Sequence, residues 1–137
     1  LWCGLNAESD WLGDIPGAVN VQGSDSYEVK RRAILGFVAG DHRVLVTKMK
    51  IAGFGLNFQN CHNMAFVGIG DSYEQYYQAI RRCWRFGQQH PVDAHIVVSN
   101  SERAIVSNVR RKQADADEMA RQLLTHMRDF EREELAS

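Results

Sequence analysis

The chain has 137 residues, of which 45% are hydrophobic, and its formal net charge is −1. This length and composition suit one compact domain with a buried core. The near-zero charge excludes a surface that is cationic throughout, so any contact with nucleic acid must be local.

The cysteine pattern and the hydropathy indicate the kind of compartment. Cys3, Cys61 and Cys83 are widely spaced, with no Cys-x-x-Cys pair and no histidine at a zinc-finger interval, so neither a disulfide framework nor a metal site is indicated. No apolar run reaches the roughly 18 residues that span a membrane. We therefore expect a reducing, cytoplasmic setting and no membrane partner. Residues 1–4 read as a strand already under way, so we expect the chain to be part of a longer protein.

Five apolar runs rich in β-formers follow one another along the chain, at residues 1–4, 18–22, 43–47, 64–69 and 94–99. Segments with the length and pattern of helices lie between them. Strands that alternate with helices predict crossover units, and hence an α/β fold with a parallel sheet covered on both faces.

Two helices are expected before residue 42. Residues 6–15 form a short candidate with Asn6 as a possible cap. Residues 24–41 open on a Ser/Asp cap signal, and Gly40 predicts the end of the helix. The spacing places Val29, Ala33 and Phe37 on one packing stripe.

A third helix is predicted over residues 73–86, and a helical projection gives it two stripes. The stripe expected to pack on the sheet contains Tyr73, Tyr77, Ile80 and Trp84.

The stripe almost opposite contains Gln78, Arg82 and Arg85. No acidic residue lies between Glu74 and Asp93, so these arginines have no local partner at helical spacing. Arginine suits a phosphate because its planar guanidinium donates two parallel hydrogen bonds and keeps its proton. From spacing alone, a phosphate contact and a solvated or core-pairing face remain equally open.

A glycine-containing loop, "KMKIAGFGLNFQ" at residues 48–59, follows the third apolar run. Gly53 and Gly55 lie two residues apart, just before Asn57. Glycines directly after a parallel strand let the backbone approach a ligand at the carboxyl edge of the sheet.

These two segments together resemble a known family. "AGFGLNFQNCHNMAFVG" is similar to motif V, and "YYQAIRRCWRFGQQHPVDAHIVVS" to motif VI, of the C-terminal RecA-like domain of superfamily 2 helicases and translocases. The resemblance is strongest to the Swi/Snf-type branch and to phage or bacterial DEAD/DEAH-like helicases. The motif VI positions that match are Gln78, Ala79, Arg82, Arg85, Gly87 and Gln88. The resemblance covers about residues 1–100, which implies a RecA-like domain there and a helical extension over 101–137.

The resemblance implies roles for particular residues. Arg85 would be the arginine finger that meets the γ-phosphate of ATP held by the N-terminal RecA-like domain of the same polypeptide, and Arg82 would share or brace that contact. The ATP cleft would also include Gln78, Gly53, Gly55 and Asn57.

Residues at the mouth of the glycine loop would contact nucleic acid, with DNA as the expected partner. Lys48 and Lys50 are candidates for the phosphate backbone, although two solvated lysines remain an equal alternative. Met49 stands where the Swi/Snf-type pattern has threonine. A hydroxyl contact there is therefore missing or supplied by Thr47.

The sequence contains no Gly-x-x-x-x-Gly-Lys-Ser/Thr loop and no Asp-Glu pair after a strand. We therefore expect ATP and Mg²⁺ to be bound mainly by a missing N-terminal domain, and the isolated chain to be inactive. The alternative is a non-catalytic α/β module that binds nucleic acid or protein through its basic helix. The presence of Gln78, Arg82 and Arg85 together favours the ATP-dependent helicase or translocase over this module.

From about Ser101, apolar residues recur at helical spacing among charges of both signs: Ala116, Ala120, Leu123, Met127 and Phe130. We expect one long amphipathic helix or a helix pair. Packing back on the sheet or on an absent neighbour is favoured over a dedicated partner-binding helix.

Overall fold

The computed structural model describes residues 1–53, 56–70 and 72–136. Gly55, assigned to the ATP cleft by resemblance, lies outside these residues.

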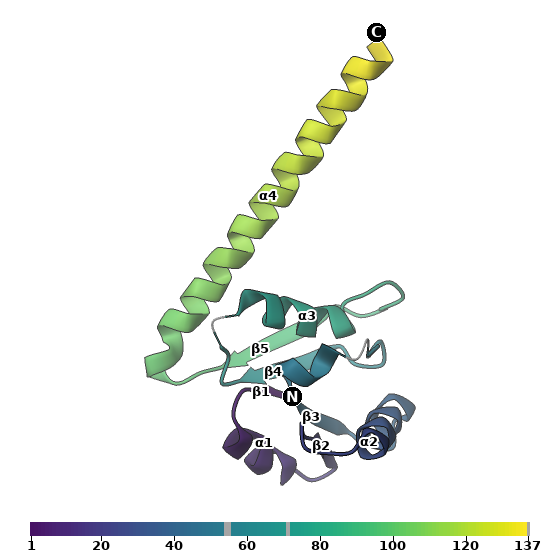
Figure 1. The fold of residues 1–137 in the computed structure, drawn as a ribbon, viewed down its shortest axis with the longest axis vertical. Helices are drawn as coiled ribbons and strands as arrows, with labels where there is room; N and C mark the ends of the chain where they lie inside the picture. The colour runs from purple at the N-terminus through teal and green to yellow at the C-terminus, as the bar shows by residue number, and fades with distance from the viewer. Residues whose placement is uncertain (54–55, 71, 137) are drawn as a thin grey trace.

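A five-stranded parallel sheet forms the centre of the molecule (Figure 1). Its strands are β1 (Trp2–Cys3), β2 (Ala18–Val21), β3 (Val44–Lys48), β4 (Asn63–Val67) and β5 (Asp93–Val97). Their spatial order is β2-β3-β1-β4-β5, and each neighbouring pair is parallel. All five predicted runs are confirmed as strands of an α/β fold. The short β1 lies at the centre, with Trp2 opposite Thr47 of β3 and Phe66 of β4.

The sheet has one large and one small hydrophobic layer because its side chains alternate between the two faces. Trp2, Leu45 and Phe66 belong to the large cluster, which α2 (Tyr27–Ala39) and α3 (Tyr73–Cys83) cover. Cys3 and Val46 belong to the small cluster, which α1 (Asn6–Gly13) covers. The prediction of helices on both faces is therefore confirmed.

The beginning of α1 differs from the prediction. Leu5, not Asn6, occupies the N-cap position, and Asn6 is the first helical residue. The Glu8 carboxylate accepts hydrogen bonds from the backbone N–H groups of Gly4 and Leu5, each at 2.9 Å. The carboxylate thereby satisfies the N–H groups of the N-cap residue and of the residue before it, which is the backward half of a capping box.

The ends of α2 follow the prediction, and its packing follows it in part. The Ser26 hydroxyl accepts from the Val29 N–H at 3.3 Å, and Gly40 ends the helix in the left-handed conformation with φ 90°. Ala33 and Phe37 are buried, whereas Val29 is 48% exposed. The packing stripe of α2 therefore excludes its first turn.

Two short 3₁₀ helices, η1 (Met49–Gly53) and η2 (Asn100–Glu102), follow β3 and β5, and the long α4 (Arg103–Ala136) ends the chain. Among the side chains that the structure describes in α4, those near its beginning pack on the rest of the domain: Val109 is 1% exposed, and Ile105 and Val106 pack on the large cluster. Figure 1 shows the remainder projecting away from the sheet.

The expectation that the tail packs back on the sheet is therefore wrong for most of α4. Met119, Leu123, Leu124 and Met127 are all more than half exposed. The division of the chain at residue 100 stays a prediction. Among the described residues, no helix is long and apolar enough to cross a membrane.

Candidate functional site

The helix that carries Arg81 and Arg82, α3, is shorter than predicted, and the face that it buries differs from the predicted packing stripe. α3 ends at Cys83 with Trp84 as its C-cap, and its buried residues are Tyr76, Ala79 and Cys83. Trp84, expected in the packing stripe, is 54% exposed. The small side chains of Ala79 and Cys83 allow the helix to approach the sheet, and the Tyr76 ring contacts Phe66 with 4.8 Å between centroids. The face that α3 turns to the sheet is therefore set by close packing of small side chains and not by burial of Trp84, its largest aromatic neighbour.

A groove of about 460 Å³ lies between α3 and η1. Its lining residues are Met49, Lys50, Ser72, Glu74, Gln75, Gln78 and Arg82. The fold thus brings two predicted ATP-cleft residues, Gln78 and Arg82, together with the predicted nucleic-acid residue Lys50. Ser72 and Gln75 were not among the residues predicted for the site. Their signal was a helix cap, since the Ser72 hydroxyl accepts from the Gln75 N–H at 3.3 Å.

Arg82 is the most constrained of the arginines. Its Nε atom is buried and has no hydrogen-bond partner within the described part of the chain. Its carbonyl oxygen accepts from the Phe58 N–H at 2.9 Å, which fixes the backbone of α3 to the loop before β4. A buried donor without an acceptor is costly, so the Arg82 guanidinium is suited to an acceptor that the groove would admit.

Arg85 lies apart from the predicted stripe. The helix has ended before it, and Arg85 is exposed on the turn at residues 84–88. Its carbonyl oxygen accepts from the Gln88 N–H at 3.0 Å, and Gly87 adopts a φ of 92°, which favours glycine. The structure therefore brings Gln78 and Arg82 into one groove but places Arg85 outside the residues that line it.

Gln88 holds this turn against the loop before β4. Its Nε2 donates to the carbonyl oxygens of Gln59, Cys61 and Cys83 at 3.2, 3.0 and 3.3 Å. Its Oε1 accepts from the His90 N–H at 3.1 Å. Sequence comparison marked Gln88 as part of a motif but gave it no role. The geometry makes it a positioning residue for the segment that carries Arg85.

The neighbouring Arg81 has a different environment. Its guanidinium carbon lies 5.4 Å from the centre of the Trp84 ring, a cation–π contact. Neither Arg82 nor Arg85 forms an ion pair with any described residue. Of the three arginines, Arg81 is thus the one with an aromatic partner.

A second groove, of about 310 Å³, lies at the carboxyl ends of β1, β3 and β4. Lys48 and Lys50 both line it, and Lys50 is shared with the first groove. The Lys48 ammonium donates to the Asn6 side-chain oxygen. Thr47 is 4% exposed, and its hydroxyl donates to the Val21 carbonyl oxygen at 3.3 Å. The Thr47 hydroxyl is therefore used inside the sheet.

Of the other predicted cleft residues, the structure describes Gly53 and Asn57, and neither is among the residues that line the two grooves. Gly53 is the last residue of η1. Asn57 is exposed, and its side-chain oxygen accepts from the Gln59 N–H at 3.2 Å, so it stabilises a local turn. No group of three or more His, Cys, Asp or Glu that could hold a metal occurs among the described residues.

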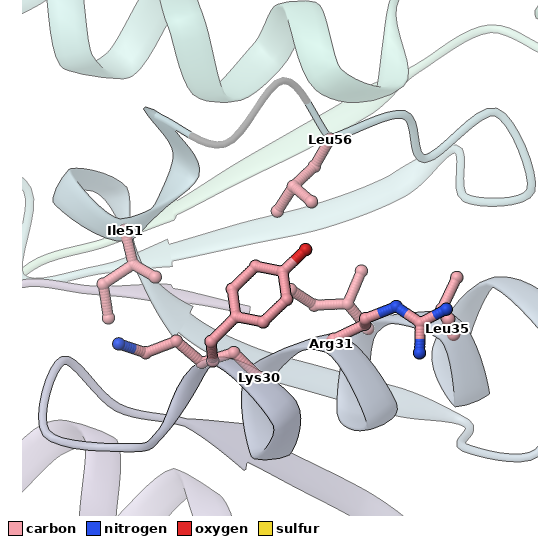
Figure 2. A pocket seen from close by; sticks show the side chains of 7 residues that line it. Lys30, Arg31, Leu35, Ile51 and Leu56 are labelled. Atoms are coloured by element: carbon pink, nitrogen blue, oxygen red, sulfur yellow. The ribbon is translucent and has the colours of Figure 1, made fainter.

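A further pocket, of about 190 Å³, is mostly apolar and lies between α2 and the segment after β3. Figure 2 shows Lys30, Arg31 and Leu35 on α2, with Ile51 and Leu56 across the pocket. None of the predicted site residues lines it.

Comparison with known proteins gives consistent matches. Residues 15–87, more than half of the chain, match the model of the helicase conserved C-terminal domain. The bifunctional helicase and thymine dioxygenase JBP2 of Leishmania tarentolae is 33% identical over 94 residues, which cover 67% of this chain and 9% of that protein. The same enzyme of Leishmania braziliensis is 33% identical over 87 residues, 63% of this chain and 8% of that protein.

The fold also matches a solved structure, that of the C-terminal part of the Fun30 ATPase domain. The TM-score is 0.70 at 18% sequence identity, and the match covers 79% of this chain and 37% of that one. This likeness supports the RecA-like fold. The chain spans less than a tenth of the curated relatives' length.

Proposed function

The chain belongs to the family of helicase conserved C-terminal domains, and we propose that it is the C-terminal half of an ATP-dependent nucleic-acid helicase or DNA translocase. In this proposal the N-terminal RecA-like domain of the same polypeptide faces the grooves beside α3. That domain would bind most of the ATP and its Mg²⁺. The chain described here would supply cationic side chains to the bound nucleotide.

The observation that carries the proposal is the environment of Arg82. Its buried Nε lacks an acceptor among the described residues, and the Arg82 side chain lines a groove together with Gln78 and Lys50. Phosphate oxygens of ATP are acceptors that match a guanidinium in charge and geometry. We therefore assign Arg82 to a phosphate contact and Gln78 to the same cleft.

Arg85 is proposed as the arginine finger. It is exposed on a turn that Gln88 fixes to the body, so its long side chain can extend toward a neighbouring domain from a held backbone. A finger of this kind stabilises charge on the transferring phosphoryl group and is worth about 10³ to 10⁵ in turnover. Asn57 and Gly53, with Gly55, stay assigned to the wider cleft by resemblance.

The second groove is proposed to contact the nucleic-acid backbone, with DNA as the partner. Lys50 lines both grooves and could couple the nucleotide site to the strand. Lys48 would have to exchange its contact with Asn6 for a phosphate. Thr47 is left out of this track because its hydroxyl is buried. ATP would close the two domains and hydrolysis would reopen them, which moves the protein along the strand.

The test is the rate of DNA-stimulated ATP hydrolysis by the full-length protein. Arg82→Ala and Arg85→Ala should each lower turnover by at least about a hundredfold while ATP affinity changes by less than about tenfold, because the contacts act on the transition state. Arg85→Lys should also fail, since lysine lacks the bidentate fork. Arg81→Ala is the matched control and should be mild.

Two results would contradict the proposal. If Arg81 is critical while Arg82 and Arg85 tolerate alanine, the assignment of the motif is wrong. If the variants lose nucleic-acid binding and the full-length protein hydrolyses no ATP, the chain belongs to a non-catalytic binding module instead. Unfolding curves of each variant separate loss of activity from loss of the fold.

A further inference from the structure

Cys61 and Cys83 are 22 positions apart in the sequence, and both lie at the junction between the end of α3 and the loop before β4. Cys61 precedes β4 and Cys83 is the last residue of α3. Both line one small cavity of about 20 Å³, together with Phe58 and Met64. The Cys61 thiol donates to the Asn63 carbonyl oxygen at 3.1 Å, and the Cys83 thiol lies near enough to influence the pKa of Cys61.

The backbone holds the two cysteines in this arrangement. A single atom, Nε2 of Gln88, donates to the carbonyl oxygens of both Cys61 and Cys83. The Phe58 N–H bonds the Arg82 carbonyl oxygen, and the Cys61 N–H bonds the Phe58 carbonyl oxygen, each at 2.9 Å. A disulfide requires two cysteine backbones close together with their side chains converging. These contacts hold the two backbones near each other, and both side chains face one cavity.

The two thiols differ in access and in acidity. Cys61 is partly exposed, whereas Cys83 is 2% exposed. The neighbouring Cys83 thiol lowers the pKa of the Cys61 thiol, although burial works against ionisation. The neighbouring Cys61 and burial raise the pKa of Cys83. Because the thiolate is the nucleophile, Cys61 is suited to attack and Cys83 to follow.

We propose that Cys61 and Cys83 form a reversible thiol–disulfide pair, oxidised by a low-molecular-weight disulfide, that ties the loop before β4 to the end of α3. Intracellular disulfides are commonly transient and redox-sensing, so this pair agrees with a reducing compartment. The inference does not depend on the proposed function.

The chemistry proceeds in two exchanges. The Cys61 thiolate attacks one sulfur of the oxidant RSSR, a mixed disulfide forms at Cys61, and RS⁻ leaves. Cys83 then releases its proton to solvent and its sulfur attacks Cys61 Sγ, so the Cys61–Cys83 bond forms as the second RS⁻ leaves. The cysteines lose two electrons and the oxidant gains them, leaving as two thiols.

The crosslink would act on the segment beside the first groove. Arg82 directly precedes Cys83, and its carbonyl oxygen is already bound by the loop that carries Cys61. Oxidation would add a covalent link to the hydrogen bonds at this junction. The last turn of α3 would then be held in one position relative to the loop.

The experiment treats the folded chain with oxidised glutathione and maps the products by peptide mass spectrometry. The expected product is an intramolecular Cys61–Cys83 disulfide, with only Cys3 left reactive after unfolding. Cys83→Ala should stop at a glutathione adduct on Cys61, and Cys61→Ala should not react. Cys3→Ala is the matched control, since Cys3 is buried in the other hydrophobic cluster, and it should behave as the unchanged chain does.

A second readout follows the reactivity of Cys61 with iodoacetamide. The pH at which alkylation is half-maximal should lie below that of an ordinary cysteine thiol in the unchanged chain, and it should move upward in Cys83→Ala, which removes the neighbouring thiol. The proposal is overturned if the unchanged chain gives only intermolecular bonds, a bond to Cys3, or a persistent glutathione adduct at Cys61. It is equally overturned if the folded chain stays reduced while the unfolded chain reacts.

Discussion

At the scale of single residues, two amide side chains hold the turn that carries Arg85. Gln59 donates to the Phe86 carbonyl oxygen. Gln88 donates to three carbonyl oxygens, two in the loop before β4 and one at the end of α3, and so joins the turn to both. The motif pattern predicted that Gln88 is important. The motif could not show that the role is structural. The acceptors are backbone carbonyl oxygens, which carry no sequence signal, and only the folded chain brings them close to Gln88.

We expect Gln88→Ala to lower the free energy of unfolding of the chain by about 1–3 kcal/mol, because carbonyl groups lose their donor in a partly buried place. Denaturant unfolding followed by circular dichroism measures this. Gln89→Ala is the matched control, since Gln89 is exposed and adjacent, and it should change stability by less than about 0.5 kcal/mol. Equal effects of the two substitutions would refute the positioning role of Gln88.

At the scale of elements, the strands were predictable, whereas the packing faces of the helices were predictable only in part: α2 buries Ala33 and Phe37 as expected, but α3 buries a different face. Each strand is a β-rich apolar run between turn signals, so local sequence identified all five strands. In α3, apolar and aromatic residues occupy more than one face, and the sequence could not show that Ala79 and Cys83 allow the closest approach to the sheet. The end of α3 also depended on contacts of residues 84–88 with a distant loop.

The expectation that α4 packs back on the sheet was wrong for most of the helix, for a similar physical reason. Its periodic apolar residues predicted a helix correctly, but periodicity does not identify what the apolar face contacts. In the structure the packing stops after Val109 and its neighbours. The grooves beside α3 were likewise unpredictable in outline, since η1 and α3 are separated by β4 in the chain.

We therefore expect removal of residues 117–137 to leave the free energy of unfolding of the remaining domain unchanged within about 0.5 kcal/mol, since surface segments contribute little. The helical circular dichroism signal should fall. Val109→Ala, by contrast, should cost roughly 1.5 kcal/mol, because two buried methyl groups are lost. A large loss of stability on truncation would show that the outer part of α4 packs on the body in solution.

At the scale of the whole molecule, the chain combines a five-stranded parallel sheet with part of a proposed catalytic site. The fold gathers Gln78, Arg82 and Lys50 in one groove, and it presents Arg85 on a fixed turn. In the proposed function, this site would stabilise charge on a nucleotide that another domain holds. The family resemblance predicted the types of residue, whereas the structure determined which of them share a groove.

The central claim is that this domain assists ATP hydrolysis but does not carry it out alone. Steady-state ATP hydrolysis, measured with saturating DNA on the isolated chain and on the full-length protein in parallel, tests it most directly. The account predicts a background rate for the isolated chain and DNA-stimulated turnover for the full-length protein. Robust hydrolysis by the isolated chain, freed of contaminating ATPase, or none by the full-length protein, would contradict it.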